Sequence, residues 1–394
     1  MAQESYHQSR AIPFWRDVRV LRVISQVIFL ILVLLLLGYL AGNMLSAMHQ
    51  AGLALGFSFL KQTSSFDIGE RLIQYDRSYT YWRAFQVGLL NTALVSILGI
   101  IIATVIGGIV GVARLSRNAL IQWLARAYIE LLRNVPLLVL LIFWYTGVFY
   151  KLPRINQAIT LPGPVLLTIR GIGIPWGLPT STFPTFVFIL VGGLFGAFLV
   201  AWGTVWYGHR TGRPPLTWFW SLLSLLIVGL AGWLILPEAP LSLDPPMIQG
   251  LRMVGGRQLS PEFMALLSGL AIYTSAFIAD VVRAGIQSVS KGQVEAAKAI
   301  GLKNFQVLRL VVFPQALRVI IPPLTSHYLN LTKNSSLAVA IGYPDLFGVS
   351  RTILNQSGRA VEVIALVMAV YLSISLLTSL FMNWYNSRIK FVER

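Results

Sequence analysis

The stretch QSVSKGQVEAAKAIGLKNFQVLRLVVFPQALR, residues 287–318, lies between two long apolar runs. Ser290, followed three residues later by Gln293, is a capping-box signature and predicts that a helix begins there. Gly301 is expected to end this helix, because glycine accepts the left-handed conformation that other residues resist. A second amphipathic piece is expected to follow, with Pro314 stopping it before the next apolar run. Two short helices around a glycine bend predict a rigid knob that suits a groove in another protein.

The apolar runs around this stretch decide the fold class. Of 394 residues, 56% are hydrophobic and only 11% are charged, whereas a soluble protein carries about 25% charged residues. A membrane-spanning helix needs ~20 mostly apolar residues. Runs that qualify or nearly do lie at about 24–44, 84–113, 136–150, 186–207, 218–236, 262–282, 319–342 and 361–385. We therefore predict an all-α integral membrane protein with about eight transmembrane helices, which excludes a soluble globular enzyme.

The third run is short because Pro136 begins it, and the sequence leaves open that its helix extends back through the amphipathic stretch from Leu120 to Arg133. Prolines in residues 151–185, and prolines and glycines in residues 237–260, favour extended structure. The hairpin between these two segments is rich in Trp and Phe, and we expect it to face lipid.

The charge distribution predicts the orientation of the spans. With the N-terminus inside, nineteen basic and six acidic residues fall on the inner side, and eleven basic and eight acidic residues on the outer side. The inner face then carries about +13 and the outer face about +3, which follows the positive-inside rule and places both termini in the cytoplasm. The net charge of +17 is therefore interpreted as a topology signal, and no nucleic-acid partner is expected.

A stripe of small residues runs along the second span. Gly99, Ala103, Gly107 and Gly111 recur at every fourth position. Such a stripe lets two membrane helices approach closely. The pattern leaves open whether the stripe forms a contact between subunits or packs against a helix of the same chain.

One lysine interrupts the seventh apolar run. Lys333 is flanked by polar residues, namely Asn330, Thr332, Asn334, Ser335 and Ser336. A lysine in a span costs ~2.5–3.5 kcal/mol on insertion scales and normally faces a cavity or a partner. We interpret this group as part of a substrate pathway in which Lys333 receives a carboxylate, and Tyr273 and Asp280 in the sixth span as possible neighbours of that pathway. The alternative is a structural lysine.

Two pairs of opposite charges stand three residues apart. Asp280 can reach Arg283, and Glu130 can reach Arg133, on one face of a helix. Structural ion pairs near the inner interface are the favoured interpretation.

Several kinds of chemistry are absent from the sequence. No lysine is followed by Ser or Thr, so the chain has no P-loop for ATP. It has no cysteine, and its four histidines show no spacing typical of metal ligands. We therefore expect no metal site, no catalytic residue and no enzymatic activity in this chain.

The knob resembles a known motif. Glu295, Ala296 and Ala297, then three residues, Gly301, nine residues, Val311, one residue, Phe313 and Pro314 resemble the EAA motif of binding-protein-dependent ABC importer permeases. SAFIADVVRAGIQSVSKGQ from 275, PQALR from 314, LTKNSSL from 331 and YIELLRNVP from 128 are similar to the polar amino-acid permeases. The N-terminal span, GFSFL at 56–60, the inserted hairpin and IGYPDL at 341–346 narrow the resemblance to the long Q-type membrane subunit of general L-amino-acid transporters. Asp280 and Phe313 depart from it, standing where Glu and Leu are commoner.

The resemblance implies an architecture and partners. The fold would be a type I ABC importer core of five helices, to which an N-terminal helix and an inserted hairpin are added. Residues 1–83 would hold a cytoplasmic segment, an anchor helix and a periplasmic loop. Residues 84–390 would form the permease domain, with the insertion at about 151–260 and the coupling loop at 287–318.

The implied function is transport of polar or acidic L-amino acids across the bacterial inner membrane. Glu295, Ala296, Ala297, Gly301 and Pro314 would couple the permease to a dimer of ABC ATPase subunits, which bind ATP and Mg. A periplasmic binding protein would deliver the amino acid, and a second, homologous permease subunit would complete the path. The alternatives are a secondary transporter driven by an ion gradient and a membrane scaffold without transport activity.

Overall fold

The computed structural model describes residues 17–50, 56–212 and 216–389. Most of the predicted N-terminal cytoplasmic segment and the last five residues lie outside this range. The chain divides into two compact units, Met1–Gln62 and Thr63–Arg394. The first unit holds α1 (Val18–Gln50), whose apolar run Val20–Ala47 is long enough to span a membrane, and a 3₁₀ turn at Ser58–Lys61.

Helices make up most of the second unit. They are α2 (Tyr81–Ala113), α3 (Ala119–Asn134), α4 (Leu137–Ile142), α5 (Phe183–Thr211), α6 (Thr217–Ile235), α7 (Pro261–Gln287), α8 (Lys291–Ala299), α9 (Asn304–Val307), α10 (Phe313–Asn334), α11 (Leu346–Ser357) and α12 (Ala360–Ile389). In the described residues, seven helices are long and apolar enough to cross a membrane, and an eighth span results if α3 and the helical segment Leu137–Lys151 count as one. The prediction of about eight transmembrane helices is confirmed.

The third predicted span does not continue straight back through Leu120–Arg133. α3 and the segment that follows it are bent by 106°. Val135 adopts an extended conformation with ψ 129°, because a residue that precedes a proline is disfavoured in the helical region. Pro136 therefore separates an amphipathic helix from an apolar one.

The core of the second unit is built around α7, which makes its most extensive contacts with α2 and α10. Leu266, Leu270 and Ile278 of α7 are fully buried. Two glycines of the α2 stripe lie against this helix: a Cβ at Gly107 would stand 2.7 Å from Ile278 and one at Gly111 2.7 Å from the Ala279 carbonyl oxygen, whereas Gly99 faces Leu331 of α10. The stripe thus packs within the chain, which is the second of the two interpretations left open by the sequence.

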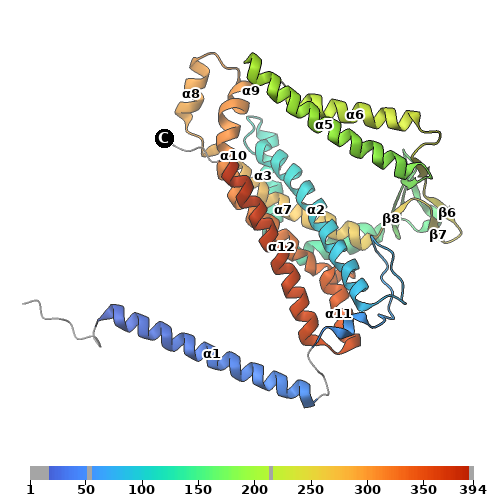
Figure 1. Cartoon of the computed structure of the whole chain (residues 1–394). Coiled ribbons are helices and arrows are strands. Elements are labelled where there is room, and N and C mark those ends of the chain that lie inside the picture. The colour runs from blue at the N-terminus through green and yellow to red at the C-terminus, as the bar shows by residue number, and fades with distance from the viewer. Residues whose placement is uncertain (1–16, 51–55, 213–215, 390–394) are drawn as a thin grey trace, which may run out of the picture. The chain divides into compact units, whose positions relative to one another are not determined.

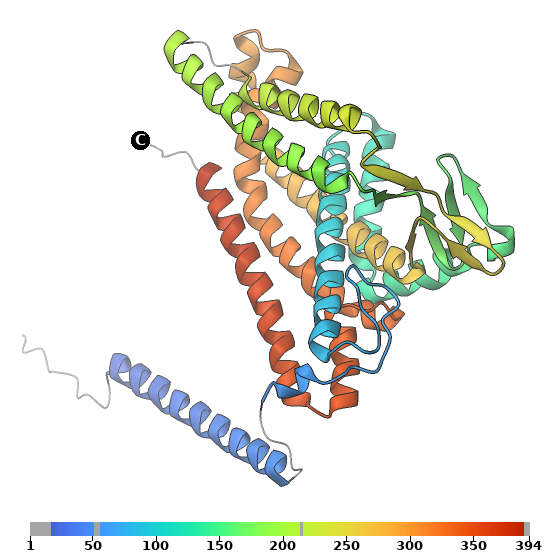
Figure 2. The ribbon, with the colours of Figure 1, turned by 45° about the vertical axis from the view of Figure 1, so that its right-hand side comes forward.

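The helices of this unit give it two distinct ends (Figure 1). α8 and α9 lie at one end, next to the end of α7 and the start of α10, and α11 lies at the other end. The same arrangement is visible after a turn of 45° (Figure 2), where the segment that leads into α2 lies at the α11 end. We call these the α8 end and the α11 end.

The proline-rich segments form short strands, as predicted. The strands are β1 (Ile159–Leu161), β2 (Val165–Thr168), β3 (Gly171–Ile174), β4 (Trp176–Pro179), β5 (Leu241–Asp244), β6 (Met247–Gln249), β7 (Arg252–Val254) and β8 (Arg257–Leu259). An antiparallel sheet has the order β1-β2-β3-β8, and β4–β5 and β6–β7 form separate pairs. In the register, Ile172 of β3 stands opposite Leu259 of β8, so this sheet leads directly into α7.

The inserted hairpin consists of α5 and α6, which pack mainly on each other. Gly193 and Gly232 allow the two helices to approach, since a Cβ at either position would come within 2.9 Å of a side chain of the other helix. Large apolar side chains such as Phe188 and Leu234 are exposed along the hairpin. Exposed apolar surface of this kind fits the predicted contact with lipid.

Candidate functional site

The predicted knob is present at the α8 end. Ser290 is the N-cap of α8, as expected, but the capping box is not formed. The side chain of Gln293 instead accepts a hydrogen bond from Gln315 of α10. The capping interaction predicted for the start of α8 is thus replaced by a hydrogen bond between α8 and the membrane-spanning helix α10.

Gly301 ends α8 in the predicted way. Its φ is +87°, the left-handed region that glycine adopts without a Cβ penalty. The Leu302 amide donates to the Ala297 carbonyl at 3.2 Å, and the Gly301 amide donates to the Lys298 carbonyl at 2.9 Å. These two bonds form a Schellman motif, which satisfies the last carbonyls of the helix.

The knob has one buried side and one exposed side. Ala297, Val307 and Val312 form a small apolar cluster of their own. Glu295 and Ala296 are exposed, and so are Ile300 and Phe305, at 79% and 69%. An exposed acid beside small and apolar side chains, held on a packed base, is a surface that another protein can bind.

Pro314 does not stop the helix, contrary to the prediction. It lies in the first turn of α10, which continues from α9 through a π-helical segment, Leu308–Val312. The wider helical turn accommodates the residue that has no amide hydrogen. The helical span therefore runs without interruption from the knob into the membrane, over Asn304–Ile341.

The charged residues of α3 and α7 form a different set of pairs from the one expected. Asp280 accepts from Arg283 of the same helix at 2.9 Å, as predicted, and also from Arg133 of α3 at 2.7 Å. Glu130 pairs with Arg126 at 2.6 Å instead of Arg133. Asp280 thus connects two helices, and its cluster with two arginines keeps one positive charge in excess.

Aromatic rings extend this cluster toward α10. Arg133 lies over the ring of Phe277, 5.3 Å from its centroid. Phe277 also contacts Tyr273, with centroids 5.0 Å apart, and His327 of α10, with centroids 5.7 Å apart. Tyr273 and Asp280, both predicted beside the pathway, therefore belong to one continuous patch on α7.

The predicted pathway residues of α10 divide into two groups. Asn330 and Lys333 are exposed, with Ser326 one turn before them, so a polar stripe runs along one face of the helix. Ser335 is buried and donates to the Thr332 carbonyl at 2.7 Å, while Asn334 and Ser336 are partly buried. The polar run does not form an irregular loop, because α10 tightens into a 3₁₀ helix at Ser335–Ile341. A polar stripe on a membrane span is expected to avoid lipid.

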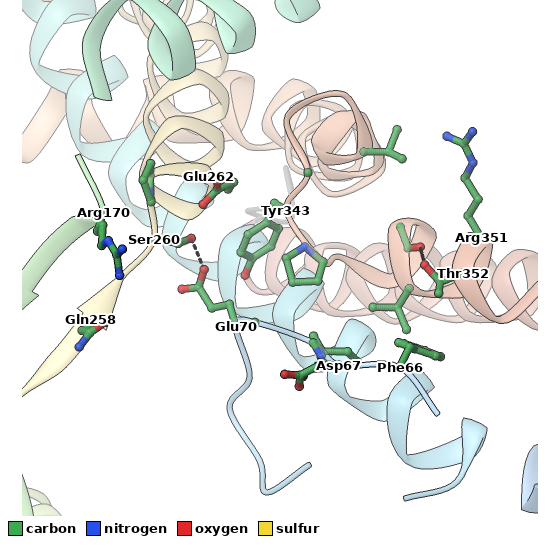
Figure 3. Close-up of a pocket in the computed structure, with 18 of the residues that line it drawn as sticks. Phe66, Asp67, Glu70, Arg170, Gln258, Ser260, Glu262, Tyr343, Arg351 and Thr352 are labelled. Atoms are coloured by element: carbon green, nitrogen blue, oxygen red, sulfur yellow. Dashed lines mark hydrogen bonds between the residues drawn. The ribbon is translucent and has the colours of Figure 1, made fainter. Parts of the chain in front are cut away.

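The α11 end contains a pocket of about 920 Å³ that the sequence analysis did not identify. Residues 63–80, the start of α7, and α11 surround it (Figure 3). The hydroxyl of Ser260, the N-cap of α7, donates to the Glu70 carboxylate and accepts from the Phe263 amide at 3.0 Å. Ser-Pro-Glu at 260–262 is a helix-start signal, but nothing in the sequence connects it to Glu70.

Glu70 has an unusual electrostatic environment. The pKa of its carboxyl is raised to about 7, mainly by burial and to a smaller extent by the nearby Glu262 of α7. The hydrogen bond from Ser260 and the charge of Arg257 in β8 oppose this rise only in part. Tyr343 also faces this group, and burial raises the pKa of its phenol as well.

No metal centre is found in the residues that the structure describes, where no cluster of three or more His, Asp or Glu could hold an ion. The fold and the two ends of the bundle define a multi-spanning helical membrane protein with an exposed knob at one end.

Comparison with known proteins identifies its family. The family described as "Binding-protein-dependent transport system inner membrane component" matches residues 245–391. The general L-amino acid transport system permease protein AapQ of Rhizobium johnstonii is 43% identical over 373 residues, which cover 94% of this chain and 93% of that protein. The putative amino-acid ABC transporter permease protein YhdX of Escherichia coli is 45% identical over 373 residues, covering 94% of each. The glutamate/glutamine/aspartate/asparagine transport system permease protein BztB of Rhodobacter capsulatus is 39% identical over 422 residues, covering 96% of each.

The chain belongs to the amino-acid ABC transporter permeases, the inner membrane components of binding-protein-dependent transport systems. It is therefore a multi-pass membrane protein and a transport subunit. This membership confirms the resemblance that was inferred from the EAA motif and its neighbours.

Proposed function

We propose that this chain translocates polar or acidic L-amino acids inward across the membrane as the permease subunit of an ABC importer. The observation that carries the proposal is α8, a short helix with an exposed acid and small residues on a packed base. Relatives that align over nearly the whole chain are named for transport of general L-amino acids and of glutamate, glutamine, aspartate and asparagine.

The energy would come from partner subunits. The chain has no P-loop, so ATP and Mg would bind to a dimer of ATPase subunits that receives the exposed Glu295 and Ala296 in a groove, while the buried Ala297 holds them on the base of the knob. The uninterrupted helix from α9 into α10 would carry a movement of the knob into the membrane. The α8 end would then face the cytoplasm, as the positive-inside distribution predicts.

The polar stripe of α10 supports a second membrane subunit. Asn330 and Lys333 are exposed in the single chain, and a charge in a span is stabilised by a partner or a water-filled path. A second, homologous permease would cover this stripe and enclose the translocation path, with Lys333 available to the substrate carboxylate. A periplasmic binding protein would deliver the substrate to the α11 end.

The test is uptake of labelled glutamate and glutamine into proteoliposomes that contain this chain with its partner subunits and binding protein. Uptake should require ATP in the compartment that the α8 end faces. It should persist when ion gradients are dissipated. Lys333→Met should reduce uptake at least tenfold, whereas Lys151→Met, at an exposed position after α4, should leave it unchanged. Uptake that follows an ion gradient and ignores ATP would overturn the proposal.

A further inference from the structure

The pocket at the α11 end shares no residue with the knob or with the α10 stripe that the proposed function uses. Segments far apart in the sequence form it, so its shape depends on the folded bundle. The Asn91 side chain of α2 holds two of them in place, since its amide donates to the Glu70 carbonyl at 2.8 Å and to the Pro344 carbonyl at 2.9 Å. The pocket is therefore a built feature of the fold.

Two carboxylates lie together in this pocket. Glu70 is held by the Ser260 hydroxyl, and Glu262 accepts from Tyr145 at 2.9 Å. Within the described part of the chain, neither carboxylate forms an ion pair. Two neighbouring acids that no ion pair neutralises repel each other and are stabilised when a positive group arrives.

A buried hydroxyl points to a ligand independently of these acids. The side chain of Tyr343 is 1% exposed, and its hydroxyl has no hydrogen-bond partner among the residues that the structure describes. Figure 3 shows this hydroxyl directed toward the side on which Glu70 lies. An unmade hydrogen bond at a buried hydroxyl is costly, so a ligand that supplies the missing partner gains that energy.

The surrounding charges restrict the class of ligand. The described residues hold no cluster of three or more His, Asp or Glu that would favour a metal ion here. Arg170 and Arg351 line the pocket on opposite sides of the two acids (Figure 3), and both are exposed. Acids at the centre and arginines at the rim fit a small molecule that carries an ammonium group and a carboxylate.

We propose that this pocket is a second amino-acid site, in which the ligand's ammonium group lies between Glu70 and Glu262 and its carboxylate meets an arginine of the rim. The Tyr343 hydroxyl accepts a hydrogen bond from the same ammonium group. A volume of about 920 Å³ leaves room for an amino acid together with water. The inference rests on the proposed function, because it takes the transported amino acids as the ligands. The site would hold a substrate molecule at the α11 end before it enters the path.

The experiment measures equilibrium binding of labelled glutamine and glutamate to the assembled complex in lipid nanodiscs, without ATP and without the binding protein. Glu70→Gln should weaken binding about 10- to 100-fold, because it removes a charge-assisted hydrogen bond. Tyr343→Phe should weaken it about 3- to 10-fold. Since this hydroxyl has no partner within the described ranges, its removal should leave folding intact.

Asp67→Asn provides the matched control. Asp67 lines the same pocket but is exposed and already paired with Arg71 at 3.2 Å, so binding should stay within twofold. Lys333→Met should also retain this binding, which separates the pocket from the α10 stripe.

The outcomes separate this inference from the proposed function. Binding that Glu70→Gln and Tyr343→Phe weaken, and Asp67→Asn does not, supports the pocket. Undetectable binding to the parent complex at millimolar ligand, or equal binding by all variants, overturns it, even where ATP-driven uptake is normal. Absence of ATP-driven uptake would instead contradict the proposed function.

Discussion

Gly301→Ala is the substitution that tests the knob most sharply. The φ of +87° at Gly301 is left-handed, and a side chain there costs about 1–2 kcal/mol. A Cβ at this position would meet no atom within 4 Å, so no clash adds to the backbone strain. This free energy corresponds to about a 5- to 30-fold shift of the equilibrium from the folded knob toward locally unfolded forms.

Gly292→Ala is the matched control in the same helix. A Cβ at Gly292 also meets no atom within 4 Å, but this residue lies inside α8, where alanine is favoured over glycine by up to about 0.5–1 kcal/mol. The same chemical change should therefore loosen the knob at one position and stabilise it at the other.

Hydrogen exchange followed by mass spectrometry measures this effect on the peptide that covers 291–302. Gly301→Ala should reduce the protection of the Leu302 amide about 5- to 30-fold, and Gly292→Ala should preserve or increase it. ATP hydrolysed per amino acid imported, measured on the reconstituted complex, should rise only in Gly301→Ala. Unchanged protection in Gly301→Ala, or the same loss in both variants, would refute the assignment of a rigid knob that depends on a left-handed residue.

Three further predictions follow from the packing and the charges. Gly107→Ala should lower the stability of the purified protein by about 1–3 kcal/mol through overpacking. Gly108→Ala should not, because a Cβ at Gly108 would meet no atom within 4 Å. Thermal unfolding in detergent distinguishes the two variants. Asp280→Asn should cost about 1 kcal/mol because it removes a link between two helices, and Glu130→Gln only about 0.3–0.5 kcal/mol as an exposed pair within one helix; equal losses would contradict the assigned pairs. Amino-acid binding in the α11-end pocket should weaken about tenfold from pH 8 to pH 6. The Glu70 carboxyl, whose pKa is about 7, must be ionised to hold an ammonium group, and its ionised fraction falls about tenfold over this range. Affinity that is constant over this range would exclude Glu70 as the acceptor.

The features that the sequence predicted well depend on local physics. The apolar runs are spans because the membrane requires about 20 apolar residues wherever they occur. Gly301 ends α8 because its conformation is decided within one helical turn. The EAA motif and the family were recognisable for the same reason, since their residues are close together in the chain.

The features that the sequence missed depend on contacts between distant residues. Ser260 and Glu70 are 190 positions apart, and Arg133 and Asp280 are 147 apart. The sequence spacing of neither pair predicts the contact. Glu130 was the nearer candidate for Arg133, but the fold brings Asp280 of another helix to it.

Tertiary structure also overrides two local signals. Gln293 is in position for a capping box, yet its side chain bonds to Gln315 of α10. Pro314 is a helix breaker in most contexts, yet a π-helical turn lets the helix continue through it. In both cases the knob is joined more tightly to the membrane span than the sequence indicated.

We propose that α8 couples this chain to ATP hydrolysis in other subunits. The most direct measurement is purification of the tagged chain from its native membrane in mild detergent, with ATPase activity assayed in the eluate, beside a variant that lacks residues 295–301. We predict ATPase activity with the intact chain and its loss with the deletion, while both proteins remain inserted in the membrane. An intact, abundant chain that purifies without ATPase activity, or a deletion variant that retains it, would contradict the account.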